Sequence, residues 1–124
     1  MLTSVLETIL ASQEVIDDRG NKHKLHSAIT PDEGELIRSL ITQHCFNHVL
    51  EIGCAYGISS LYIGEALKRR EHPQHTIIDP LQNSYWQVIG IHNLRSAGYL
   101  DFVQLIEMPS EIVLPRFLEE NKTF

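Results

Sequence analysis

The chain has 124 residues, of which 43% are hydrophobic and 21% charged, and this size and composition predict one soluble globular domain. No stretch approaches the roughly 18 consecutive apolar residues that a membrane span requires, so no membrane association is expected. The net charge is -6 and the basic residues are scattered apart from Lys68–Arg70, which excludes the basic face typical of nucleic-acid-binding proteins. Cys45 and Cys54 form neither a zinc quartet nor a disulfide framework, so we expect reduced thiols and a cytoplasmic protein.

The first predicted element is an N-terminal helix. Apolar residues recur at helical spacing between Leu2 and Leu10, and Glu7 within this run argues against a signal peptide. We therefore expect a helix and connector over residues 1–24, followed by the main domain over residues 25–124.

A second helix is predicted from its start signals. Thr30 is placed as the N-cap, Pro31 is the first helical residue, and Glu33 completes a capping box three residues after the cap. One apolar face of this helix is formed by Leu36, Ile37, Leu40 and Ile41.

The rest of the chain alternates between strands and helices. Short apolar strands are predicted over residues 48–52, 75–78 and 99–107. Helices are predicted over residues 59–68, 85–98 and 110–122, the second capped by Gly98 and the third kinked or restarted at Pro115. This alternation predicts an α/β fold in which a Rossmann-like parallel sheet is flanked by helices.

The turn after the first strand is the candidate binding site. In an open parallel sheet, ligands bind beyond the carboxyl ends of the strands, and Gly53 and Gly57 frame the turn at that place. A dinucleotide site needs glycine at positions 53, 55 and 58, where this chain has Ala55 and Ile58. A P-loop is excluded because no Gly-Lys-Ser/Thr follows.

The residues present instead form a different pattern. Glu51, Gly53, Ala55 and Gly57, together with Asp79 at the end of the second strand, resemble the cofactor motifs of class I S-adenosylmethionine-dependent methyltransferases. The sequence around them is most similar to that of the small-molecule O-methyltransferases related to the catechol and caffeoyl-coenzyme A enzymes, over about residues 25 to 118. The resemblance implies S-adenosylmethionine as cofactor and methyl transfer to an oxygen of a small-molecule acceptor.

The resemblance also implies where the cofactor lies. The backbone from Gly53 to Gly57 would follow the methionine part, with Glu51 near its amino group, Asp79 on the ribose and Ser110 near the adenine. The expected cofactor-binding residues are Glu51, Gly53, Cys54, Ala55, Tyr56, Gly57, Ser59, Asp79 and Ser110. No metal and no catalytic residue is assigned.

Several of these side chains have a second interpretation. Ser59 or Ser60 can cap a helix instead of contacting a ligand. Tyr56 can flank the cofactor or cover the sheet, and Tyr85 and Trp86 can belong to the core and its rim or to a substrate cage.

The resemblance implies an incomplete sheet, since only three of the family's seven strands are found. The strand over residues 48–52 would then be an edge with unpaired backbone groups, which favours pairing with another chain. We expect a homodimer or a second chain that completes the sheet. The alternative to a methyltransferase, or its cofactor-binding half, is a non-catalytic cofactor-binding or assembly module derived from one.

Overall fold

A computed structural model describes residues 2–124 of the chain. In chain order its elements are α1 (Ser4–Ser12), β1 (Glu14–Ile16), β2 (Lys22–Lys24), α2 (Pro31–Gln43), β3 (His48–Ile52), α3 (Ile58–Leu67), β4 (Gln74–Ile78), α4 (Ile89–Ser96), the 3-10 helix η1 (Leu100–Phe102), β5 (Val103–Ile106) and α5 (Ser110–Glu119). Within residues 2–124, no helix is long and apolar enough to cross a bilayer.

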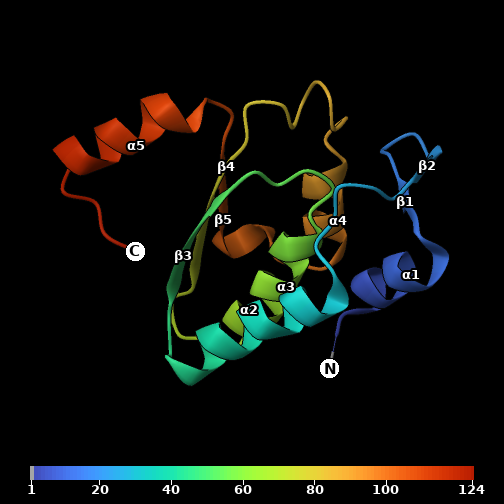
Figure 1. Cartoon of the computed structure of the whole chain (residues 1–124), viewed down its shortest axis with the longest axis horizontal. Coiled ribbons are helices and arrows are strands. Elements are labelled where there is room, and N and C mark those ends of the chain that lie inside the picture. Colours follow the sequence, from blue (N-terminus) through green and yellow to red (C-terminus); the bar gives the residue numbers. More distant parts are fainter. Residues whose placement is uncertain (1) are drawn as a thin grey trace.

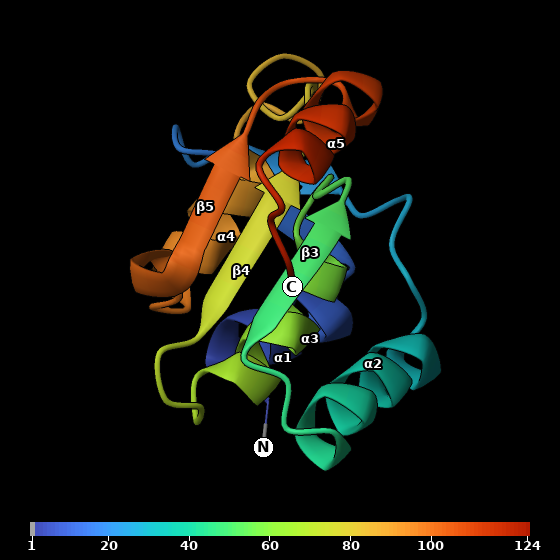
Figure 2. The same ribbon diagram turned by 90° about the vertical axis from the view of Figure 1, so that its left-hand side faces the viewer.

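The main sheet is parallel and has the strand order β3-β4-β5. Helices α1, α3 and α4 lie on one face of this sheet, and α5 lies on the other (Figure 1, Figure 2). The predicted α/β fold with a Rossmann-like parallel sheet of three strands is therefore confirmed. Because all three strands run in the same direction, their carboxyl ends share one edge of the sheet, where the glycine turn lies.

The largest core cluster fills the space between the sheet and the helices behind it. It joins residues far apart in the sequence, including Leu6, Val15, Leu61, Ile77 and Leu94, each at most 1% exposed. A smaller cluster on the opposite face is formed by Ile78, Val113 and Phe117 under α5. Helix α3 is buried on almost every side, which explains why its sequence is apolar all round. This burial holds the turn that precedes α3 in a fixed place.

Helix α2 begins as its sequence predicts. The Thr30 hydroxyl accepts a hydrogen bond from Glu33 N, and the Glu33 carboxylate accepts one from Thr30 N, so the capping box is present. Its apolar face is only half covered, because Ile41 is buried against α3 whereas Leu36 and Leu40 stay exposed.

Two boundaries and the predicted break at Pro115 differ from the sequence-based expectation. Helix α4 begins at Ile89 instead of residue 85, because Gln87 and Val88 adopt left-handed backbone angles that a helix cannot contain. The third strand begins only at Val103, since η1 first turns the chain from α4 back into the sheet. Helix α5 continues through Pro115 without a restart.

A short antiparallel hairpin, β1–β2, was not expected in the N-terminal connector. Its strands have three residues each and are mostly polar, so they produce no apolar run that a sequence pattern could detect. Of the two apolar residues in the hairpin strands, Val15 enters the main core and Ile16 stays exposed.

The capping box allows a direct test of the fold. Replacing Thr30 by alanine removes the acceptor of Glu33 N and should lower the free energy of unfolding by about 1 kcal/mol, measured by urea denaturation. The matched control is Thr42→Ala in the same helix, whose hydroxyl bonds only to the Arg38 carbonyl and whose effect should stay within about 0.5 kcal/mol. Equal effects of the two substitutions would contradict the assigned role of Thr30.

Candidate cofactor site

The turn between β3 and α3 has an unusual backbone. Gly53, Ala55 and Gly57 all adopt positive φ angles, of 87°, 51° and 84°. A Cβ atom on Gly57 would lie 3.0 Å from the Gly90 carbonyl oxygen, whereas one on Gly53 would meet no atom within 4 Å. Glycine is thus required at position 57 by both conformation and packing, and the space beside Gly53 is open.

The carboxylate of Asp79 holds this turn from the end of β4. Its Oδ2 accepts hydrogen bonds from Cys54 N at 2.9 Å and Ala55 N at 3.0 Å, and its Oδ1 accepts one from Leu81 N at 2.9 Å. Asp79 is only 3% exposed, so these donors compensate for the removal of its charge from water. The sequence-based prediction placed this residue beside the turn but did not foresee that it would bind the turn itself.

Glu51, near the end of β3, is joined to the first turn of α3. Its two carboxylate oxygens accept hydrogen bonds from the hydroxyls of Ser59 and Ser60, and His75 Nε2 lies 3.2 Å from Oε1. Both serines therefore lie inside α3 and bind Glu51, so the interpretation of either as an N-cap is wrong. The N-cap is Gly57, which has no side chain to cap the free N–H groups of the helix.

A cavity of about 250 Å³ opens beside the turn. It is lined by two segments, Ser27–Ile29 in the connector before α2 and Glu51–Ser59 around the turn, except for Gly57. Six of the nine expected cofactor residues line it, namely Glu51, Gly53, Cys54, Ala55, Tyr56 and Ser59. Most of the residues predicted to bind the cofactor thus lie around one cavity, next to the uncapped start of α3.

An aromatic cluster borders the same turn. Tyr56 is buried, its hydroxyl lies 3.1 Å from His26 Nε2, and its ring packs edge-on against Trp86. Removal from water raises the pKa of the Tyr56 hydroxyl, and the nearby Tyr85 adds to this effect. Trp86 is half-buried against the main core, and Tyr85 is exposed beside it. Through His26, this cluster ties the connector to the turn.

Cys54 contributes its backbone to the site and not a reactive thiol. The side chain is 2% exposed, and its removal from water, reinforced by the charge of Glu51, raises the pKa of the thiol to about 12. The thiol is therefore protonated at neutral pH and is a poor nucleophile.

Three of the expected residues lie outside the cavity lining, and Asp79, which holds the turn from the end of β4, is one of them. Gly57 forms the N-cap of α3, directly after the lining residues. Ser110 begins α5, after β5 at the same carboxyl edge of the sheet. Its placement near an adenine stays a prediction.

The sequence did not reveal the buried side chains that bind the turn from the segment after β4. Gln82 is fully buried and Asn93 nearly so, and each donates a hydrogen bond of 2.9 Å to a carbonyl of the turn, that of Ala55 and that of Tyr56 respectively. One signal was available, because a glycine within a helical pattern, Gly90, often marks a close approach of two backbones.

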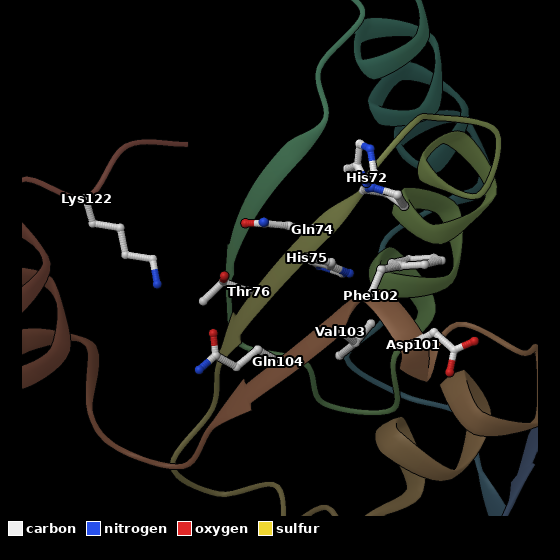
Figure 3. A pocket seen from close by; sticks show the side chains of 10 residues that line it. His72, Gln74, His75, Thr76, Asp101, Phe102, Val103, Gln104 and Lys122 are labelled. Carbon is white, nitrogen blue, oxygen red and sulfur yellow. The ribbon is translucent and has the colours of Figure 1, made fainter.

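A second hollow, of about 410 Å³, lies at the opposite, amino end of β4 and β5 (Figure 3). There Gln74, Thr76 and Gln104 point toward Lys122, on the α5 side of the sheet, while His75 and Val103 point the other way. This hollow contains none of the turn residues, so it is separate from the candidate cofactor site.

Comparison with known proteins identifies the class of protein that this fold and site define. Residues 50–124 match the sequence model of a family described as a methyltransferase domain. The match covers more than half of the chain, so the chain belongs to this family. No curated protein sequence matches the chain significantly.

Solved structures with the same fold are O-methyltransferases and other methyltransferases. An O-methyltransferase from Bacillus cereus in complex with SAH is 19% identical, with a TM-score of 0.72, and the match covers 100% of this chain and 51% of that one. The O-methyltransferase TomG from Streptomyces achromogenes in complex with SAM is 18% identical, with a TM-score of 0.71 and coverage of 94% and 48%. An SAH-bound methyltransferase from Podospora anserina is 18% identical, with a TM-score of 0.71 and coverage of 93% and 46%. The chain spans about half the length of these proteins.

The burial of Cys54 predicts its chemical reactivity. With a thiol pKa of about 12, only about one Cys54 side chain in 10,000 is ionised at pH 8, so iodoacetamide should modify the exposed Cys45 and leave Cys54 intact. Mass spectrometry of the alkylated protein checks this, with the urea-unfolded protein, in which both thiols should react, as control. Modification of Cys54 at the rate of Cys45 in the folded protein would show that the turn is open.

Proposed function

We propose that the chain is the cofactor-binding half of an S-adenosylmethionine-dependent methyltransferase that transfers a methyl group to an oxygen of a small-molecule acceptor. The observation that carries the proposal is the cavity beside the glycine turn, where Glu51, a left-handed backbone and the uncapped start of α3 meet. Bound S-adenosylmethionine supplies a methyl group on a positively charged sulfur. The protein's contribution is to bind and orient that group.

The chemistry of the cavity fits the methionine part of the cofactor. The free N–H groups at the start of α3 favour an anionic group such as the carboxylate of methionine. The carboxylate of Glu51 favours a cationic amino group nearby. The open space beside Gly53 admits a ligand close to the backbone, which a Cβ atom would hinder.

We further propose that Asp79 binds the ribose and that Ser110 lies near the adenine. Asp79 Oδ1 accepts one hydrogen bond, from Leu81 N, and a carboxylate oxygen can accept two. One acceptor position on Oδ1 is thus left for a ribose hydroxyl.

Residues 25–124 would form the cofactor-binding domain, with residues 1–24 as an added N-terminal segment.

A non-catalytic cofactor-binding or assembly module is the second candidate. It is supported by the cavity lining, in which no residue is assigned a chemical role in methyl transfer. The two candidates share the cofactor site and differ in activity. An assay for methyl transfer to a suitable acceptor therefore distinguishes them.

We also propose that the edge of β3 pairs with another polypeptide, either a second copy or a chain that completes the sheet. Within residues 2–124, β3 forms a ladder only with β4. Apolar side chains are also exposed on β3 and on the helices α2 and α5, namely Ile52, Leu36, Leu40 and Leu118. An added strand would satisfy the free backbone groups and cover this surface.

Substitution of Asp79 tests the cofactor site. Asp79→Asn removes the charge that orders the turn and should weaken SAH binding about tenfold or more, because hydrogen bonds to a charged group are the strong ones. Isothermal titration calorimetry measures the affinity. The control, Asp101→Asn, makes the same change at an exposed position at the other end of the sheet and should leave the affinity unchanged. No SAH binding by the unmodified protein at millimolar concentration would refute both candidate functions.

The edge of β3 is tested by the state of association. Sedimentation velocity should show a homodimer, or a complex with a chain that supplies the missing strands, because an exposed apolar edge favours pairing. The double variant Leu36→Glu, Leu40→Glu should weaken the association, because it places charges on the exposed apolar face of α2. Leu25→Glu is unsuitable as a control, because the Leu25 side chain packs against the main core. Glu7→Lys on the exposed side of α1 is a suitable control. The proposal would be contradicted if the protein stays a monomer at high concentration and forms no complex with a chain that supplies further strands.

A further inference from the structure

The glycine turn is held against the segment that follows β4 by two buried amide side chains. Gln82 Nε2 donates to the carbonyl of Ala55, and Asn93 Nδ2 donates to the carbonyl of Tyr56, both at 2.9 Å. Gln82 is 0% and Asn93 5% exposed, so neither contact can be replaced by bulk water. These amides thus fix two consecutive carbonyls of the turn on the side away from the cavity.

The orientation of the Gln82 amide is itself determined by its surroundings. Its Oε1 accepts a hydrogen bond from Ile91 N at 3.2 Å, and its Nε2 lies 3.2 Å from Asp79 Oδ2 as well as binding Ala55 O. With its acceptor engaged by a backbone N–H, the amide presents its donor side to the turn. Gln82 therefore connects the carboxylate that holds the amides of the turn to one of the carbonyls of the turn.

The close approach of α4 makes these contacts possible. A Cβ atom on Gly90 would lie 2.5 Å from the Ala55 carbonyl oxygen and 2.6 Å from Cys54 Sγ. Only glycine leaves room for the first turn of α4 to reach the backbone of the glycine turn. Asn93 then lies one helical turn further along α4, at the distance its short side chain can span.

The direction of these carbonyls decides what the turn offers on its other side. In a planar trans peptide, the C=O of one residue and the N–H of the next point in opposite directions. Because the Ala55 carbonyl points to Gln82, the Tyr56 N–H points away from it, and among residues 2–124 it has no hydrogen-bond acceptor. Tyr56 lines the cavity. A free donor is therefore held at the wall of the candidate cofactor site.

We infer that Gln82 and Asn93 are positioning residues of the cofactor site, which hold the turn in the shape that receives the methionine part of S-adenosylmethionine. This inference rests on the proposed function. It predicts that loss of either amide weakens binding of ligands that carry the methionine part and has little effect on ligands that lack it.

The experiment compares two ligands. Asn93→Ala should weaken the binding of SAH about tenfold, while the affinity for adenosine, which lacks the amino-acid part, should change less than about twofold. Gln82→Met is the second variant, with the same expectation. Asn83→Ala, an exposed amide in the same segment, is the control and should leave both affinities unchanged. Isothermal titration calorimetry measures the affinities, and circular dichroism establishes that each variant is folded.

The outcomes separate the inference from the proposed function. A loss of affinity that is equal for SAH and adenosine would show a purely structural role and would overturn the inference, as would an unchanged affinity for SAH. In both cases the unmodified protein still binds SAH, so the proposed function stands. If the unmodified protein binds neither ligand, the proposed function itself fails.

Discussion

The contact between the Asp79 carboxylate and the backbone of the glycine turn is the interaction on which the site depends. A carboxylate that is 3% exposed must be compensated by hydrogen-bond donors, and the N–H groups of a turn without a regular ladder must find acceptors. Each satisfies the other, because Cys54 N and Ala55 N donate to the same oxygen. The contact joins the carboxyl ends of β3 and β4 and so places the turn at the edge of the sheet where ligands of this fold class bind.

The two ends of the turn are held in different ways. At its start, Glu51 binds the hydroxyls of Ser59 and Ser60 and thereby connects β3 to the first turn of α3. At its end, Gly57 begins α3, whose burial in the core prevents it from shifting. On its inner side, the turn's Ala55 and Tyr56 carbonyls are thus bound by protein side chains, whereas the Tyr56 N–H has no acceptor within residues 2–124. Such an arrangement suits a site that receives a polar cofactor without first having to reorganise.

The remainder of the structure is asymmetric about β3. On one side, β4 and β5 continue the sheet and the main core packs behind them. On the other side, the strand edge is free among the described residues, and α2 and α5 expose Leu36, Leu40 and Leu118. The capped helix α2 shows the same asymmetry within one element, since Ile41 is buried and the neighbouring apolar residues are not. The proposed cofactor site and the proposed association surface therefore lie at different edges of β3.

The sequence by itself determined the order of the elements, the capping box at Thr30, the parallel sheet and the cofactor motif from Glu51 to Gly57 with Asp79. The capping box and the glycine turn depend on short-range chemistry, because caps and turns are set by residues a few positions apart, and the parallel sheet follows from the alternation of strands and helices. Only the tertiary structure decided the start of α4 at Ile89, the hairpin around Val15, and the placement of Gln82, Gly90 and Asn93 beneath the turn. Their positions depend on contacts between residues up to 37 apart in the chain. Buried polar side chains that bind such distant backbone groups follow no sequence periodicity, so a sequence pattern cannot predict them.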